Sequence, residues 1–146
     1  MTDQEFMMGD ETLLLVDDEE PILDVNREIL EILGYRVVVA ASGSEAIETF
    51  RSGCDFDLVL LDMIMPGMSG AETFDALRII NPDIKIILVT GYSFDGQAAA
   101  ILEKGCNGFI QKPFRIANLS RIIRKVLTTP EQVLCLNPRN ADLCVL

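Results

Sequence analysis

Five short apolar segments, each followed by a segment with helical spacing, constrain the fold of this chain more than any other feature. Apolar runs of strand length that alternate with amphipathic helices are typical of parallel sheets covered on both faces. Right-handed crossovers make such sheets doubly wound. The sequence therefore predicts an α/β fold, a doubly wound five-stranded parallel sheet with five helices. The expected strands are 13–16, 36–40, 58–61, 84–90 and 108–111, and the expected helices are about 21–33, the segment after Ser42, and 71–80, 97–104 and 116–127.

Turn and cap residues support these boundaries. Gly34 follows the first helical pattern as a stop signal, and Ser42 and Glu45 have the spacing of a capping box at the start of the second helix. The segment 63–70 contains Pro66, Gly67, Ser69 and Gly70, so we expect it to form a loop. Asn81 and the proline after it end the third helix.

The length of 146 residues indicates one domain, which we expect over 12–127, with an N-terminal extension over 1–11. The tail over 128–146 contains two prolines and has weak periodicity, so we expect it to lie outside the fold. No apolar run approaches the roughly 18 residues of a membrane span, and the acidic N-terminus does not resemble a signal peptide. We therefore expect a cytoplasmic location and no membrane partner.

The formal net charge of −11 removes one class of partner, because nucleic acids are polyanions and their binding needs a basic surface. The acidity has two readings: a device for solubility, or carboxylates gathered around a cation. The chain has no histidine, which excludes Ser-His-Asp and Cys-His catalysis, histidine-ligated zinc and a phosphohistidine on the chain itself. Its four cysteines form no C-x-x-C pair, so buried or incidental thiols are the simpler interpretation.

Polar residues follow four of the expected strands. In a doubly wound sheet, ligands bind at the carboxyl ends of the strands, near the point where the strand order reverses. Taken singly, these residues have ordinary explanations: a solvated helix cap, a turn aspartate, a strand end and a surface charge. Those explanations do not predict that all of them fall at one edge of one sheet. The residues are Asp17 and Asp18 (then Glu19 and Glu20), Asp62, Thr90 with Gly91, and Lys112.

The chemistry of such a cluster is specific. Two carboxylates about 4 Å apart repel by a few kcal/mol at an effective dielectric constant near 20, so three of them need a cation. Oxygen ligands without histidine or thiolate suit Mg²⁺, and an aspartate can accept a phosphoryl group. Catalysis of that transfer is mostly positioning and neutralisation of negative charge. Lys112 can supply positive charge, Thr90 a hydroxyl donor, and Gly91 room for the group to enter.

The chain resembles the receiver domains of bacterial two-component response regulators over about 12–127. This resemblance implies that Asp62 is the phosphoacceptor and that Asp17, Asp18 and Asp62 bind Mg²⁺ together with the backbone carbonyl of Ile64. The motifs that carry it are LLLVDDEE at 13–20, LVLLDMIMPGMSG at 58–70, ILVTGY at 87–92 and GFIQKPF at 108–114.

The resemblance also assigns the switch. Thr90 and Lys112 occupy the positions of the family's switch hydroxyl and lysine, and Phe109 that of its rotating aromatic residue. Phe109 is not a tyrosine, so it has no phenol to hydrogen-bond in the active state. In the family, the side chains two positions after the phosphoacceptor and two after the switch hydroxyl border the approach of water to the phosphoryl group. Here these residues are Ile64 and Tyr92, which predicts slow self-dephosphorylation.

The implied function is that of a phosphorelay receiver. It takes a phosphoryl group from the phosphohistidine of a sensor histidine kinase or phosphotransfer protein, and it signals to a downstream protein through its fourth helix, fifth strand and fifth helix. It promotes its own phosphotransfer and slow dephosphorylation, and is otherwise no enzyme. The stretches at 62–77 and 105–114 resemble receivers of hybrid sensor histidine kinases, so a stand-alone protein and a segment of such a kinase both stay open.

Three other functions fit this fold class less well. A phosphohydrolase with an aspartate nucleophile needs a second acid two residues later, where Ile64 stands. A flavin-binding module needs a phosphate loop rich in serine, threonine and glycine after the first strand, where four acids stand instead. The third alternative is a phosphorylation-independent interaction domain of the same fold, although every residue of the phosphorylation set is present.

Overall fold

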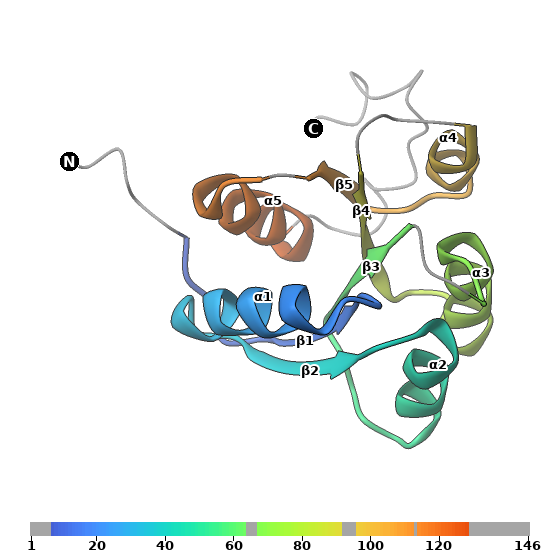
Figure 1. Cartoon of the computed structure of the whole chain (residues 1–146), viewed down its shortest axis with the longest axis horizontal. Coiled ribbons are helices and arrows are strands. Elements are labelled where there is room, and N and C mark those ends of the chain that lie inside the picture. Colours follow the sequence, from blue (N-terminus) through green and yellow to red (C-terminus); the bar gives the residue numbers. More distant parts are fainter. Residues whose placement is uncertain (1–6, 64–66, 92–95, 113, 129–146) are drawn as a thin grey trace.

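The computed structural model describes residues 7–63, 67–91, 96–112 and 114–128, and within them five strands alternate with five helices (Figure 1). This order confirms the predicted fold class. The elements with predicted bounds lie within one residue of them, and the second helix begins directly after Ser42. The strands are β1 (Thr12–Val16), β2 (Arg36–Ala40), β3 (Leu58–Asp62), β4 (Lys85–Thr90) and β5 (Gly108–Gln111). The helices are α1 (Glu20–Ile32), α2 (Gly43–Arg51), α3 (Gly70–Ile80), α4 (Gly96–Glu103) and α5 (Ile116–Thr128).

The five strands form one parallel sheet in the order β2-β1-β3-β4-β5. After β1 the chain adds β2 on one side, and it then returns to add β3, β4 and β5 on the other side. The strand order thus reverses between β1 and β3, which is where a doubly wound sheet binds its ligands. Val16 pairs with Leu61 across this junction, so the residues after β1 leave the sheet beside the end of β3.

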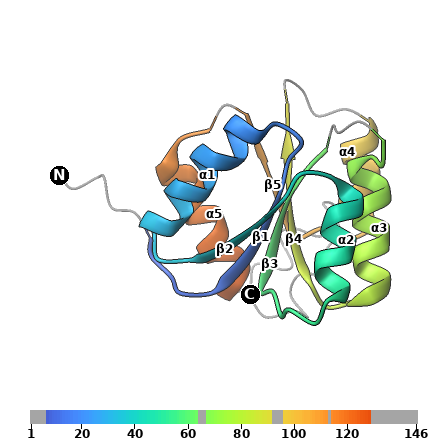
Figure 2. The same cartoon turned by 60° about the horizontal axis from the view of Figure 1, so that its bottom comes forward.

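Helices cover both faces of the sheet, as Figure 2 shows: α1 and α5 lie on one face, and α2, α3 and α4 on the other. The side chains of β1 alternate between the two resulting cores, with Leu13 and Leu15 facing α1 and α5, and Leu14 and Val16 facing the other helices. All five residues of β3 are buried, because this central strand is covered on both faces. The last of them is an aspartate, which is an unusual residue in such a strand.

Local capping differs from the expectation at two helices. Ser42 Oγ accepts the backbone N–H of Glu45 as predicted, but the Glu45 carboxylate accepts from the N–H of Ala41 and not from that of Ser42. The complete capping box lies at α3, between Ser69 and Glu72. Because of this box, α3 begins at Gly70, a residue that the sequence places in the preceding loop. Gly34 has a positive φ of 107° after α1, as its stop role requires.

An ion pair fastens α5 to the end of the sheet opposite the carboxyl ends of the strands. The Arg124 guanidinium donates two hydrogen bonds of 2.8 Å to the Glu11 carboxylate and a third, of 3.2 Å, to the Tyr35 hydroxyl. The hydrogen bonds from Arg124 lower the pKa of Glu11 from 4.5 to about 2. The segment before β1 also contacts the helices, since Gly9 donates to the Leu33 carbonyl. The predicted tail lies almost wholly outside the described residues.

Arg78 of α3 makes a second long-range connection. Its guanidinium donates to the carbonyl oxygens of Ile84 and Gly105 and to Oδ1 of Asn107, at 2.9, 3.2 and 2.9 Å. It also lies over the ring of Phe74, 4.9 Å from the ring centroid. These bonds join α3 to the start of β4 and to the turn between α4 and β5. No helix among the described residues is both long enough and apolar enough to cross a membrane.

Candidate functional site

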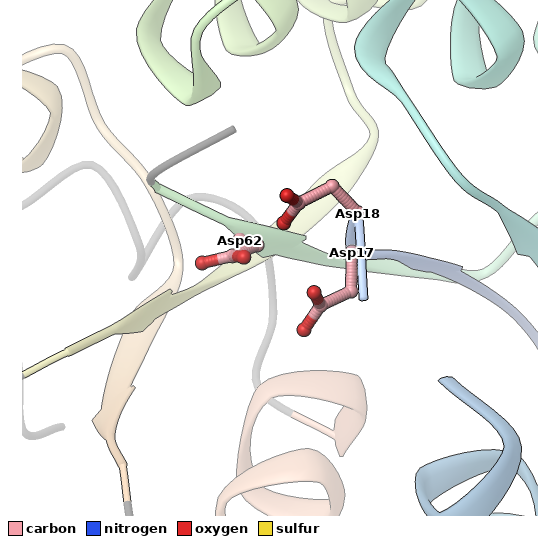
Figure 3. Close-up of side chains that lie close together, drawn as sticks. All are labelled: Asp17, Asp18 and Asp62. Carbon is pink, nitrogen blue, oxygen red and sulfur yellow. The ribbon is translucent and has the colours of Figure 1, made fainter. Parts of the chain in front are cut away.

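Three carboxylates meet where the strand order reverses. Asp17 and Asp18 extend from the end of β1 toward Asp62 at the end of β3 (Figure 3). One carboxylate oxygen from each residue lies within 4.8 Å of the others. Asp17 and Asp62 are buried, and Asp18 is half-buried. Carboxylates at this separation repel one another strongly when they are shielded from water, so the arrangement is suited to a bound cation.

The backbone fixes the direction of Asp17. Its N–H donates to the Ala40 carbonyl of β2, and its Oδ1 accepts the backbone N–H of Glu19 at 3.0 Å. The second bond is an Asx turn, in which an aspartate accepts from the residue two positions later. This bond of Glu19 was not predicted from the sequence. The sequence feature that could have predicted the Asx turn is Asp17 itself, because aspartate commonly forms such a turn where a strand leads into a helix.

Strand β4, on the side of β3 opposite β1, holds Asp62 in position. This aspartate pairs with Val89 of β4, and the next residue, Met63, donates its N–H to the Val89 carbonyl at 3.0 Å. The carboxylate therefore leaves the sheet at its centre, between the two acids of β1 and the end of β4. This is the position from which one acidic side chain can contact both a cation and groups supplied by β4 and β5.

Lys112 supplies positive charge to this cluster from the far end of β5. Its Nζ lies 3.2 Å from Oδ2 of Asp17 and 3.8 Å from Oδ2 of Asp62. Burial is the largest single influence on the pKa of Lys112 and lowers it, but the charges of Asp62 and Asp17 together outweigh burial, so that the pKa is raised. The lysine thus stays protonated and partly neutralises two of the three acids.

Thr90 offers a donor that the described part of the chain leaves unused. The residue is 3% exposed, and its Oγ1 has no hydrogen-bond partner there, whereas its carbonyl accepts the N–H of Lys112 at 2.8 Å. A buried hydroxyl without a partner costs about 1–3 kcal/mol, so such groups commonly mark a functional site. Its position after β4 lets it serve an oxygen atom bound near Asp62.

The donor set fits a magnesium ion. Three carboxylates within reach of one another are hard oxygen ligands, and among the described residues no histidine or thiolate accompanies them. A residual negative charge, left after pairing with one lysine, favours a divalent cation. The predicted fourth ligand, the backbone carbonyl of Ile64, lies outside the described residues. The orphaned Thr90 hydroxyl further fits an anion such as phosphate beside the ion.

Of the remaining predicted site residues, the structure describes Gly91 and Phe109 but not Tyr92. Gly91 follows Thr90 directly, and a Cβ built on it would meet no atom within 4 Å, so there is open space beside it. Phe109 is 40% exposed on β5, where it pairs with Leu88. Tyr92, which the resemblance places on the rim of the site with Ile64, also lies outside the described residues.

Comparisons with known proteins identify the family of the chain. The family model of the response regulator receiver domain matches residues 13–124. The chain is 37% identical over 122 residues to the sensor kinase CckA of Brucella abortus, covering 83% of this chain and 13% of that protein. It is 35% identical over 115 residues to the two-component response regulator 24 of Arabidopsis thaliana, covering 79% of this chain and 83% of that protein.

Solved structures give the same result. The response regulator TrrA of Thermotoga maritima, in complex with Mg²⁺ and BeF, is 36% identical with a TM-score of 0.70, covering 80% of this chain and 98% of that one. A CheY-like receiver domain protein of Methanospirillum hungatei is 33% identical with a TM-score of 0.76, covering 82% of this chain and 94% of that one. The chain thus spans a small part of the kinase that it resembles and most of the receivers.

Proposed function

Since this chain belongs to the response regulator receiver domain family of two-component systems, we propose that Asp62 is its phosphoacceptor and that Asp17, Asp18 and Asp62 hold Mg²⁺. The observation that carries the proposal is the cluster itself. Three carboxylates lie within 4.8 Å of one another, with a lysine ammonium 3.8 Å from the central one. In a purely structural role, the repulsion among three neighbouring acids would only destabilise the fold.

The transfer uses the Asp62 carboxylate as the nucleophile. One of its oxygens forms the new bond to phosphorus, and the bond from phosphorus to the imidazole nitrogen of the donor phosphohistidine breaks, after which the imidazole takes up a proton from solvent. Bound Mg²⁺ supplies neutralisation of the negative charge that spreads over the phosphoryl oxygens. The chain contributes position: Asp17 is fixed by its Asx turn and Asp62 by its pairing with β4.

Lys112 and Thr90 complete the phosphate site from the other side of Asp62. Lys112 pairs with both Asp17 and Asp62 in the unphosphorylated protein, so its ammonium is close enough to meet an arriving phosphoryl oxygen. The Thr90 hydroxyl is the donor for a second oxygen, which would satisfy a group that is otherwise buried without a partner. Lys112 therefore exchanges carboxylate oxygens for phosphoryl oxygens as the reaction proceeds.

Phosphorylation then changes the face formed by α4, β5 and α5. When Thr90 moves toward the phosphoryl group, it vacates space into which Phe109 can turn. Such a switch needs only a few kcal/mol to shift between two packings. Phe109 is partly exposed before the switch, so its burial would change the surface that a downstream protein contacts. Ile64 and Tyr92, which the family resemblance assigns to the rim, would limit the access of water and give the phosphoryl group a long lifetime.

The location of the domain and its phosphodonor are proposed from the family. We propose a receiver domain over 12–127 in the cytoplasm, with a sensor histidine kinase or a phosphotransfer protein as its donor. A stand-alone receiver and a receiver attached to a kinase both have relatives among the similar proteins. The phosphorylation chemistry is the same in both settings, because all of the proposed groups lie within the receiver.

Acetyl phosphate tests the proposal without a kinase. The protein is incubated with Mg²⁺ and acetyl phosphate, and its intact mass is measured. The wild type should gain one acid-labile phosphoryl group, Asp62→Asn should gain none, and Asp55→Asn, which changes an exposed aspartate, should behave as the wild type. A wild type that gains no phosphoryl group would favour the phosphorylation-independent interaction domain of the same fold.

A further inference from the structure

Two helices on the same face of the sheet begin in the same way. Gly43 and Gly70 are the first residues of α2 and α3, and both are buried. A serine caps each helix immediately before the glycine, and a glutamate follows as the third helical residue. The two glycines therefore share their position in the helix, although the capping box is complete only at α3. They differ in what lies against them.

Gly70 lies against the main chain of the acceptor strand. A Cβ built on it would lie 2.7 Å from the carbonyl oxygen of Asp62, 2.7 Å from Cα of Met63 and 2.8 Å from the carbonyl oxygen of Met63. Unbonded carbon atoms prefer separations of about 3.5–4.0 Å, so a methyl group at this position must displace something. All three atoms belong to the backbone, which cannot turn aside as a side chain can.

The Asp62–Met63 backbone has little freedom to move away. On one side, Met63 donates its N–H to the Val89 carbonyl of β4, and Asp62 pairs with Val89 in the sheet. On the other side, Gly70 donates its N–H to the Met63 carbonyl at 3.1 Å. A displacement must therefore break one of these bonds or move the end of β3. Either change shifts the Asp62 carboxylate relative to Asp17 and Lys112.

We propose that Gly70 is a positioning residue for Asp62. Its lack of a side chain lets the first turn of α3 rest directly on the backbone at the end of β3, which sets where the Asp62 carboxylate lies among its neighbours. The inference rests on the proposed function of Asp62. It adds a residue that touches neither the phosphoryl group nor the metal ion.

Gly43 provides a matched control. The three atoms nearest to a Cβ at Gly43 all belong to side chains, Oγ1 of Thr73 in α3 and Cγ and Sδ of Met68 just before it. Gly43→Ala should therefore destabilise the packing of the two helices without moving β3. Both variants overpack a buried site, so both should unfold at a lower urea concentration than the wild type.

The experiment compares wild type, Gly70→Ala and Gly43→Ala in three measurements. Urea unfolding gives the stability of each protein, calorimetric titration gives its Mg²⁺ affinity without a phosphodonor, and intact mass gives its rate of phosphorylation by acetyl phosphate. Rates and affinities are expressed per folded molecule, with sucrose added to all samples where a variant is partly unfolded, because excluded osmolytes favour the folded state.

Gly70→Ala should react roughly 10- to 100-fold more slowly than wild type, because a misplacement near 1 Å can cost about 100-fold in rate. Its Mg²⁺ affinity should also fall several-fold, whereas Gly43→Ala should keep the wild-type rate and affinity. Equal rates and affinities for the two folded variants would overturn the inference. If the wild type is phosphorylated and the variants match, only the role of Gly70 fails; a wild type without phosphorylation refutes the proposed function itself.

Discussion

Asp18→Asn should make the metal-free protein more stable and remove most of the stabilisation by Mg²⁺. Asp18 contributes one oxygen within 4.8 Å of those of Asp17 and Asp62. At that separation and an effective dielectric constant near 20, two unit charges repel by roughly 3 kcal/mol. Lys112 neutralises part of the charge on the other two acids, and Asp18 is half-buried, so its net repulsion is smaller.

We expect the free energy of unfolding without metal to rise by about 1–2 kcal/mol in Asp18→Asn, because the amide keeps the shape of the side chain and removes its charge. For a domain of this size the change corresponds to roughly 4–8 °C in Tm. In the wild type, Mg²⁺ at about 100 times its Kd should stabilise the folded state by about 2.7 kcal/mol, and the variant should show only a small part of this effect.

Thermal unfolding monitored by circular dichroism, with and without Mg²⁺, measures both effects. Asp24→Asn is the matched control, since Asp24 is an exposed acid on α1 and its substitution changes the net charge equally. It should leave both Tm values close to those of wild type. A metal-free Tm for Asp18→Asn that is equal to or below that of wild type, or an undiminished Mg²⁺ shift, would refute the electrostatic account of the site.

Three further predictions concern other parts of the molecule. The depressed pKa of Glu11, about 2, means that its ion pair with Arg124 stabilises the fold above pH ~4.5 and that this stability is lost as the pH falls toward 2. Glu11→Gln should therefore lose about 2 kcal/mol at pH 7 and show a shallower acid transition in urea titrations at several pH values; parallel pH profiles would contradict this. Arg78→Met removes three hydrogen bonds and should lower the free energy of unfolding by about 2–3 kcal/mol, whereas Arg121→Met, at an exposed arginine of α5, should change it by less than about 0.5 kcal/mol; similar values for both would count against a structural role. Ile64→Asn should speed the loss of the phosphoryl group in Mg²⁺ buffer by roughly tenfold or more, because a polar side chain can orient water, and an unchanged half-life would argue against that role.

Much of the site could be predicted from the sequence because parallel strands bring their carboxyl ends to one edge. Once the apolar runs were identified as strands, Asp17, Asp62, Thr90 and Lys112 had to fall at that edge. The structure confirms the sheet, brings carboxylate oxygens of Asp17, Asp18 and Asp62 within 4.8 Å of one another, and places Lys112 beside Asp17 and Asp62. The sequence did not reveal that Lys112 lies nearer to Asp17 than to Asp62, since side-chain reach across two strands depends on rotamers.

Other features depended on contacts between segments distant in the chain. The pair of Glu11 and Arg124 spans 113 positions, and neither residue has a neighbour in the sequence that predicts the other. The tight contact of Gly70 depends on the capping box that starts α3 one residue earlier than expected. A glycine in a loop and a glycine packed against a strand cannot be distinguished from the sequence. Only the packing of α3 on the end of β3 separates them.

The most direct test of the central claim is to locate the phosphoryl group chemically. After reaction with acetyl phosphate and Mg²⁺, borohydride reduces an aspartyl phosphate to homoserine, and tandem mass spectrometry of the digested protein finds the reduced position. We expect homoserine at position 62, formed only when the phosphodonor and Mg²⁺ are both present. Homoserine at another aspartate, or a phosphoryl group on a serine or threonine with residue 62 unchanged, would contradict it.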